Sequence, residues 1–230
     1  MFIVLKKKTV IWVAALLAAI IAIGVALGVR FSAEKTAAFG QKTVVIDAGH
    51  GGMDRGVIGK NGTEEAEKNL EIAEKLREVL SDAGFFVVMT RTTDGGADET
   101  ANFKQEDFRK RKATIEKANP DMVLSIHCNK FPSSDRRGAQ VFYNGVSKEG
   151  KVLADVMQHS LNGLNAEQLG KTFSALKGEY YMLNCSDAPS IIVECGFLSN
   201  PEDEALLSDK VYLEKLVFSL YGGIVAYLDA

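Results

Sequence analysis

The chain has 230 residues, 47% of them hydrophobic and 25% charged, which is enough for one domain of ordinary size with a packed core and an appendage. The first 30 residues hold four of the 27 basic residues and none of the 30 acidic ones, so the remainder carries a formal charge of −7. That sign excludes the basic surface that a nucleic-acid-binding protein uses, and we expect no nucleic-acid partner.

The first element is an uncharged apolar stretch of 20 residues, 10–29. It is long enough to span a hydrocarbon core of about 30 Å, whereas the apolar part of a cleaved signal peptide runs to about 7 to 15 residues. Lys6, Lys7 and Lys8 precede it, so the positive-inside rule keeps that end in the cytoplasm. We therefore expect a single-pass membrane anchor at residues 1–30, a tether at 31–42 and an extracytoplasmic domain at 43–230. A cleaved signal peptide is the alternative.

The domain opens with an apolar strand, residues 43–46, that runs into His50 and three flanking glycines. Glycines permit backbone conformations and close approaches that side chains forbid. The pattern places His50 at the carboxyl end of a strand, where open α/β sheets hold their ligands. A turn histidine beside a glycine-rich loop is the competing interpretation. The spacing matches neither common phosphate-binding loop.

Helices and strands then alternate along the chain. The periodicity predicts an α/β fold, a single domain whose sheet is covered on both faces by helices. The expected helices are residues 64–82, 103–118, 148–164, 202–207 and 211–228, and the expected further strands are residues 85–90, 122–126, 139–143, 180–183 and 190–193.

Two more polar residues follow predicted strands directly. His127 comes after residues 122–126 and Glu194 after residues 190–193, so we expect both near His50, with an acid from the start of the first helix. Two imidazoles and one carboxylate are a catalytic zinc set, because they leave the fourth tetrahedral position open. Glu194 would then manage protons. His159 lies in a predicted helix among polar neighbours and is interpreted as a surface residue.

The three cysteines, Cys128, Cys185 and Cys195, are few and odd in number, so no disulfide framework is expected and at most one pair could bridge. Side-chain alternation along residues 190–195 turns Cys195 away from Glu194. We expect this thiol to be packed in the core rather than catalytic.

Six blocks in this order, VVIDAGHGG, GTEEAEKNLEIAEKL, VVMTR, MVLSIHCN, GAQVFY and IIVECGFLSN, closely resemble the zinc-dependent N-acetylmuramoyl-L-alanine amidases of the family-3 type. The resemblance covers about residues 42–228. It implies a mixed sheet of about six strands between helical layers, one Zn²⁺ per chain and peptidoglycan as the substrate. The bond cut is the amide between the lactyl group of N-acetylmuramic acid and L-alanine of the stem peptide.

Carried over residue by residue, the resemblance implies His50 and His127 as metal ligands and Glu194 as the catalytic glutamate. Family members read E-K-x-x-x-L-x-I-A at the first helix, and alignment of L-x-I-A places the remaining ligand at Glu65. Glu67, which precedes a lysine, stays open as the second choice for that ligand.

The sequence departs from the family at two positions, with Ala66 in place of lysine and Ala48 in place of proline. Neither departure removes a ligand. Arg91 and Arg111 match basic positions of the family, and either a structural ion pair or a substrate contact could account for them.

The single anchor and the lack of wall-binding repeats look most like the germination-specific spore-cortex members. An accessory protein or a cooperating cortex deacetylase is the kind of partner that this narrower resemblance implies. Two other functions stay open: a zinc peptidase acting on the stem peptide, and a catalytically silent glycan-binding module. The second would be expected to lose a ligand or Glu194, and the sequence keeps them all.

Only 11 residues, 128–138, separate His127 from the strand that follows, and five of them are turn formers. A segment of this length and composition forms a loop rather than a helix that plugs the site, because isolated helices shorter than about 12 to 15 residues are marginal. We expect the metal site to be open to substrate.

Overall fold

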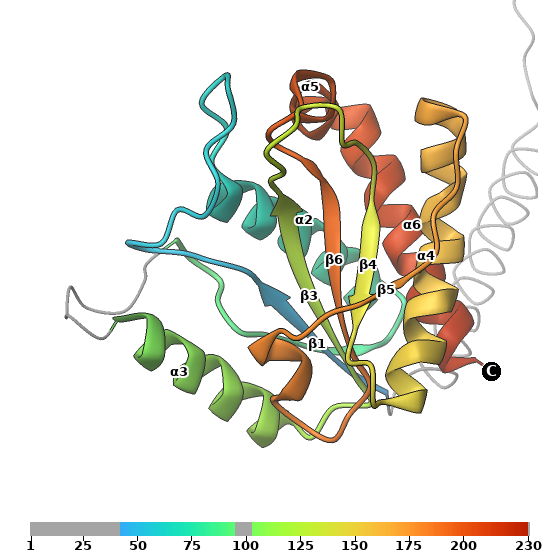
Figure 1. Ribbon diagram of the computed structural model, residues 1–230. Helices are drawn as coiled ribbons and strands as arrows, with labels where there is room; N and C mark the ends of the chain where they lie inside the picture. The colour runs from blue at the N-terminus through green and yellow to red at the C-terminus, as the bar shows by residue number, and fades with distance from the viewer. Residues whose placement is uncertain (1–41, 95–102, 230) are drawn as a thin grey trace, which may run out of the picture.

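The computed structural model describes residues 42–94 and 103–229 (Figure 1). The expected anchor and all but the last residue of the expected tether lie outside the described residues. The strands are β1 (Thr43–Ala48), β2 (Phe86–Met89), β3 (Met122–Asn129), β4 (Gln140–Tyr143), β5 (Leu176–Lys177) and β6 (Ser190–Phe197). The helices are α2 (Glu65–Asp82), α3 (Phe103–Ala118), α4 (Lys148–Leu169), α5 (Pro201–Ser208), α6 (Lys210–Leu228) and the 3₁₀ helix η1 (Tyr181–Asn184).

The six strands form one mixed sheet in the order β2-β1-β3-β6-β4-β5. The first four strands are parallel to one another, β4 runs antiparallel to β6, and β5 is parallel to β4. The α/β class and the mixed sheet of six strands are thereby confirmed.

Helices cover both faces of the sheet, as the alternation of elements predicts (Figure 1). The main core lies between the sheet and α2, α4 and α6, and a smaller core lies on the opposite face beneath α3 and η1. The largest fully buried side chains of the main core include Ile46, Ile72, Leu76, Leu124, Met157 and Leu161, whereas Ile115 of α3 belongs to the smaller one.

Side-chain alternation in β3 and β6 separates apolar from functional residues. Ile126 and Cys128 of β3 and Val193 and Cys195 of β6 face the main core. His127 and Glu194 are paired across the two strands, and alternation turns them to the α3 face. The expectation that both strands stop before these residues is wrong, because the ladder between β3 and β6 continues through polar positions.

The structure corrects the strand expected at residues 180–183 and confirms the loop expected after β3. Residues 180–183, expected as a strand, instead begin a 3₁₀ turn in which the Leu183 amide donates to the Tyr180 carbonyl. The strand that pairs with β4 at the edge of the sheet is β5, not residues 180–183. The segment 130–139 between β3 and β4 contains no helix, which confirms the expected loop.

Within the described ranges, α6 is the one helix long and apolar enough to cross a membrane. Its side chains Leu216, Leu220 and Ile224 are fully buried in the main core, at the spacing that predicts packing on the sheet. Because its apolar stripe is used inside the domain, α6 is a core helix.

The three cysteines are free and buried, and burial raises the pKa of the Cys128 and Cys195 thiols. We expect a Cys185→Ser chain, purified without reductant, to show no thiol reactive toward a soluble disulfide reagent while folded. It should show two after unfolding in guanidinium chloride. The folded chain is unreactive because only the thiolate reacts and neither sulfur reaches solvent. An unfolded chain with no titratable thiol would instead mean that Cys128 and Cys195 bridge.

Candidate metal centre

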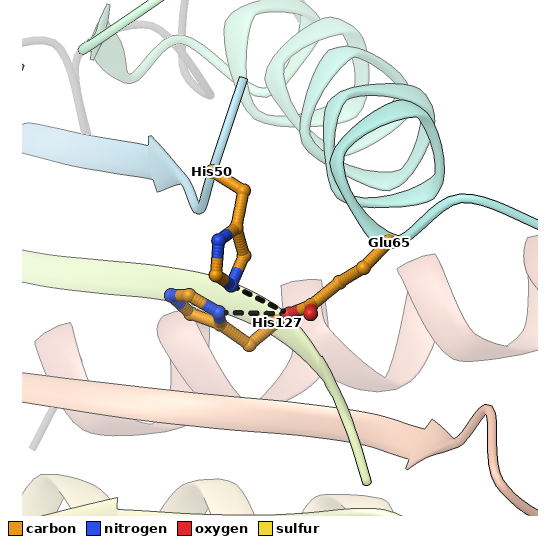
Figure 2. A group of neighbouring side chains, drawn as sticks. All are labelled: His50, Glu65 and His127. Atoms are coloured by element: carbon orange, nitrogen blue, oxygen red, sulfur yellow. Dashed lines mark hydrogen bonds and ion pairs between the residues drawn. The ribbon is translucent and has the colours of Figure 1, made fainter. Parts of the chain in front are cut away.

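Three side chains with metal-binding atoms, His50, Glu65 and His127, point toward one another beside the end of β1 (Figure 2). Oε1 of Glu65 lies 3.2 Å from Nε2 of His50 and 3.0 Å from Nδ1 of His127. One potential ligand atom from each residue lies within 4.8 Å of the other two. The imidazole rings meet edge to face, with their centroids 5.0 Å apart. The group can therefore hold a metal ion.

Each of the three residues comes from a different element. His127 lies within β3, Glu65 is the first residue of α2, and His50 follows β1 in a turn. The backbone of His50 has φ +61°, a left-handed conformation that costs a non-glycine residue about 1–2 kcal/mol. A Cβ atom at Gly49 would lie only 2.2 Å from the His127 ring, so glycine is needed there for the ring to lie against the turn.

The structure distinguishes the two candidate acids of α2. The Glu65 side chain is 4% exposed and contacts both histidines, whereas Glu67 is exposed on the outer side of the helix. Residue spacing alone left both open, since each lies in the first turn of the helix. The alignment that favours Glu65 is therefore the one consistent with the fold.

Glu65 is held by the backbone as well as by the histidines. Its Oε2 accepts a hydrogen bond from the Val57 amide at 2.8 Å, and its Oε1 accepts one from the Cys128 amide at 3.2 Å. Burial alone would raise the pKa of Glu65, but the hydrogen bonds from His127 and His50 hold it well below its usual range. The carboxylate is therefore ionised and fixed in position.

Asp54 orients His50 from the other side of its ring. Its Oδ2 lies 3.1 Å from Nδ1 of His50 and 3.3 Å from Nζ of Lys104. Nε2 of His50 donates to Glu65 in this structure. If Nε2 bound a metal ion instead, the Asp54 carboxylate would favour the tautomer with the proton on Nδ1 and leave the Nε2 lone pair for the ion. Sequence analysis did not single out Asp54, although an acid four residues after a candidate ligand is a usable signal.

Glu194 lies beside this group without a hydrogen-bond partner. Its Oε2 is buried and accepts no bond from any residue that the structure describes. Burial raises the pKa of Glu194 to about 7, against the lowering effect of His127. A buried acceptor without a partner is costly, so its presence beside a candidate metal site indicates a functional role.

A groove with a volume of about 520 Å³ passes over the site. Tyr180, Lys104 and Lys130 line it together with the candidate ligands and Glu194. Its walls carry both charges, from the two lysines and from the acids Asp54, Glu65 and Glu194, and Tyr180 supplies an aromatic surface. The groove can therefore accept an extended polar substrate.

The remaining polar residues that the sequence singled out lie outside the converging group. Arg111 forms a buried ion pair with Asp47 at 2.7 Å, and Arg91 donates to buried backbone carbonyls. Both contacts favour the structural interpretation of these arginines over substrate contact. His159 is exposed on α4, as expected.

Comparison with known proteins agrees with this architecture. The sequence profile of the N-acetylmuramoyl-L-alanine amidase family matches residues 44–226. The germination-specific N-acetylmuramoyl-L-alanine amidase of Bacillus subtilis is 35% identical over 191 residues, which cover 81% of this chain and 79% of that protein.

Solved structures give the same relationship. The CwlD amidase from Clostridioides difficile, solved in complex with the GerS lipoprotein, has a TM-score of 0.76 and 35% identity and covers 82% of this chain and 99% of its own. The catalytic domain of CwlV, an N-acetylmuramoyl-L-alanine amidase from Bacillus (Paenibacillus) polymyxa, has a TM-score of 0.70 and 29% identity, with coverage of 82% and 99%. The chain therefore belongs to the N-acetylmuramoyl-L-alanine amidase family and is a peptidoglycan hydrolase.

Proposed function

We propose that His50, Glu65 and His127 bind one zinc ion and that Glu194 is the catalytic acid and base in cleavage of the amide between N-acetylmuramic acid and L-alanine. The observation that carries the proposal is the convergence of two imidazoles and a carboxylate beside a buried carboxylate oxygen that has no partner among the described residues. The donor set fits zinc, because two neutral imidazoles and one anion leave a tetrahedral position open and a net positive charge. Mg²⁺ and Ca²⁺ prefer oxygen ligands instead.

A zinc ion held by His50, Glu65 and His127 would supply Lewis-acid chemistry, that is, polarisation of the scissile carbonyl and a lower pKa for the attacking water. Asp54 fixes the His50 ring so that Nε2 faces the site. Glu194 accepts the proton of the attacking water and delivers it to the leaving nitrogen of L-alanine. That delivery is needed because an amide anion is too poor a leaving group.

The competing functions are less well supported. A silent glycan-binding module has no need for a buried, partnerless Glu194 beside three metal-binding groups. A peptidase acting elsewhere on the stem peptide would share the zinc chemistry, but the family match favours the muramoyl amide. The loop at residues 130–139 leaves the site accessible without release of an inhibitory helix.

For the biological setting, we infer that the substrate is spore-cortex peptidoglycan. The 35% identity to a germination-specific amidase supports this substrate. The CwlD amidase was solved with a lipoprotein bound, which supports an accessory protein for this chain as well. A cooperating cortex deacetylase stays a prediction from the resemblance.

The first test concerns the metal ligands. We expect the full-length chain, solubilised in detergent, to hold one zinc ion and to release L-alanine-terminated stem peptides from peptidoglycan. Glu65→Ala should lose tight zinc binding, because one of three protein ligands is gone, and Glu67→Ala is the matched control on the same helix turn. Zinc content by mass spectrometry that is retained in the first variant and lost in the second would assign the ligand to Glu67.

The second test concerns Glu194. Glu194→Gln should fold and hold zinc but lose about 10²- to 10⁴-fold in kcat, because an amide side chain cannot transfer the proton. Glu214→Gln, an exposed position on α6, controls for the substitution itself. Near-normal kcat in a zinc-loaded Glu194→Gln chain would mean that another group moves the proton.

The third test concerns the membrane. We propose that residues 1–30 remain attached and hold the catalytic domain, residues 43–230, on the outer side of the cell membrane, since the uncharged span is long for a signal peptide. Mass analysis of the native protein should find the intact N-terminal segment in the membrane fraction. A mature N-terminus between Ala33 and Gln41 would show that the segment is removed.

A further inference from the structure

Three successive backbone carbonyls at the end of β1 accept hydrogen bonds from two arginine side chains. The Ala48 carbonyl accepts from Nε of Arg91 at 2.8 Å and from Nη1 of Arg111 at 2.6 Å. The Gly49 carbonyl accepts from Nη2 of Arg91 at 3.0 Å, and the His50 carbonyl from Nη2 of Arg111 at 2.5 Å. The chain leaves the sheet at this point, so no neighbouring strand supplies these donors.

Arg91 also reaches the first turn of α2. The Nη2 atom that donates to the Gly49 carbonyl donates to the Ala66 carbonyl at 2.7 Å. Gly49 precedes His50 and Ala66 follows Glu65, so one guanidinium joins the backbone next to two of the candidate ligands. The position of Arg91 therefore fixes the separation of the β1 turn and the start of α2.

Two carboxylates hold the Arg111 side chain in place. Its Nη1 donates to Oδ1 of Asp47 at 2.7 Å, and its Nε donates to Oδ2 of Asp107 at 2.7 Å. Asp47 is 1% exposed and also accepts from the hydroxyls of Thr90 and Ser125 at 2.7 and 2.5 Å. Arg111 therefore links the carbonyl of His50 to Asp47, a buried residue of the sheet.

The contacts of both arginines argue against a role in holding substrate. The side chains of Arg91 and Arg111 are 9% and 4% exposed. Every guanidinium nitrogen of the two residues already donates to a carbonyl or carboxylate, with Nη1 of Arg91 bonded to the Thr93 carbonyl at 3.3 Å. Four of the five guanidinium N–H groups of each arginine are used in these bonds, so a substrate would find at most one N–H on each.

We propose that Arg91 and Arg111 are positioning residues that hold His50 in its left-handed conformation and set its distance from Glu65 for metal binding. This proposal rests on the proposed zinc site. Lysine cannot replace either arginine, because a single ammonium on a flexible stem does not span the four carbonyls bound by Arg91 or the two bound by Arg111 as the planar guanidinium does. Charge is conserved in such a change and geometry is lost.

The test is the zinc dissociation constant of the full-length chain, measured by competition with a chromophoric chelator. Arg91→Lys and Arg111→Lys should each weaken zinc binding about 10- to 100-fold, the range seen when groups that orient metal ligands are altered. Arg109→Lys is the matched control, because Arg109 lies on the exposed side of the same helix as Arg111 and, within residues 42–94 and 103–229, donates only to the Gln105 carbonyl.

A second control separates positioning from general destabilisation. Ile115→Ala removes a fully buried side chain from α3, so it should lower the melting temperature while the zinc affinity of the folded chain stays unchanged. Asn69→Ala removes a donor to the Gly49 carbonyl, at 3.1 Å, and to Oε1 of Glu65, at 3.4 Å, and should give a smaller loss of zinc affinity. If an arginine variant does not fold, unchanged zinc affinity in folded Asn69→Ala would overturn the positioning role of the contacts at the Gly49 carbonyl.

The outcomes distinguish this proposal from the one it rests on. Zinc affinity in folded Arg91→Lys and Arg111→Lys equal to that of Arg109→Lys would overturn the positioning role and leave the zinc site intact. A loss in Ile115→Ala as large as in the arginine variants would show that loosening of α3 suffices and would also overturn it. A wild-type chain that holds no zinc would overturn the metal site itself, and the positioning role with it.

Discussion

The parallel pairing of β1, β3 and β6 is the constraint on which the site depends. It aligns Asp47 with Ser125 and His127 with Glu194, so that the polar residues of three strands fall on one face of the sheet. The apolar residues between them fall on the other face and build the main core. A shift of one residue in this register would exchange the two sets and bury the histidine among leucines.

Buried charge on the α3 face is compensated at each position but one. Asp47 is paired with Arg111, and Glu65 accepts bonds from two histidines and two backbone amides. Glu194 alone has a buried oxygen without a donor among the described carboxylates. An isolated carboxylate in such a position is disfavoured as an anion, which is why burial raises its pKa. A cation in the site would lower that pKa again and would complete the electrostatic balance.

The C-terminal part of the chain holds the loops around the site. Glu204 of α5 is 1% exposed and accepts hydrogen bonds from the Asn61 and Thr63 amides, just before α2 begins. Its neighbour Asp203 accepts from the amides of Gly138 and Phe197. Glu204 therefore holds the segment just before Glu65 against α5. Asp203 joins the loop after β3 to the end of β6.

Periodicity predicted the α/β class with helices on both faces of the sheet, strand ends predicted that His50, His127 and Glu194 meet, and the family resemblance added the mixed sheet. Strand and helix periodicity is a local property, and family blocks preserve the order of the elements. Alignment of the family blocks already favours Glu65 over Glu67, and the tertiary structure adds that Glu65 contacts both histidines whereas Glu67 is exposed. Only the tertiary structure decided the roles of Arg91 and Arg111, whose acceptors include backbone carbonyls. Every residue has a backbone carbonyl, so the residue type does not mark which carbonyl accepts a bond. The partners of these arginines follow only from the tertiary structure, which brings the end of β1, the start of α2 and α3 together.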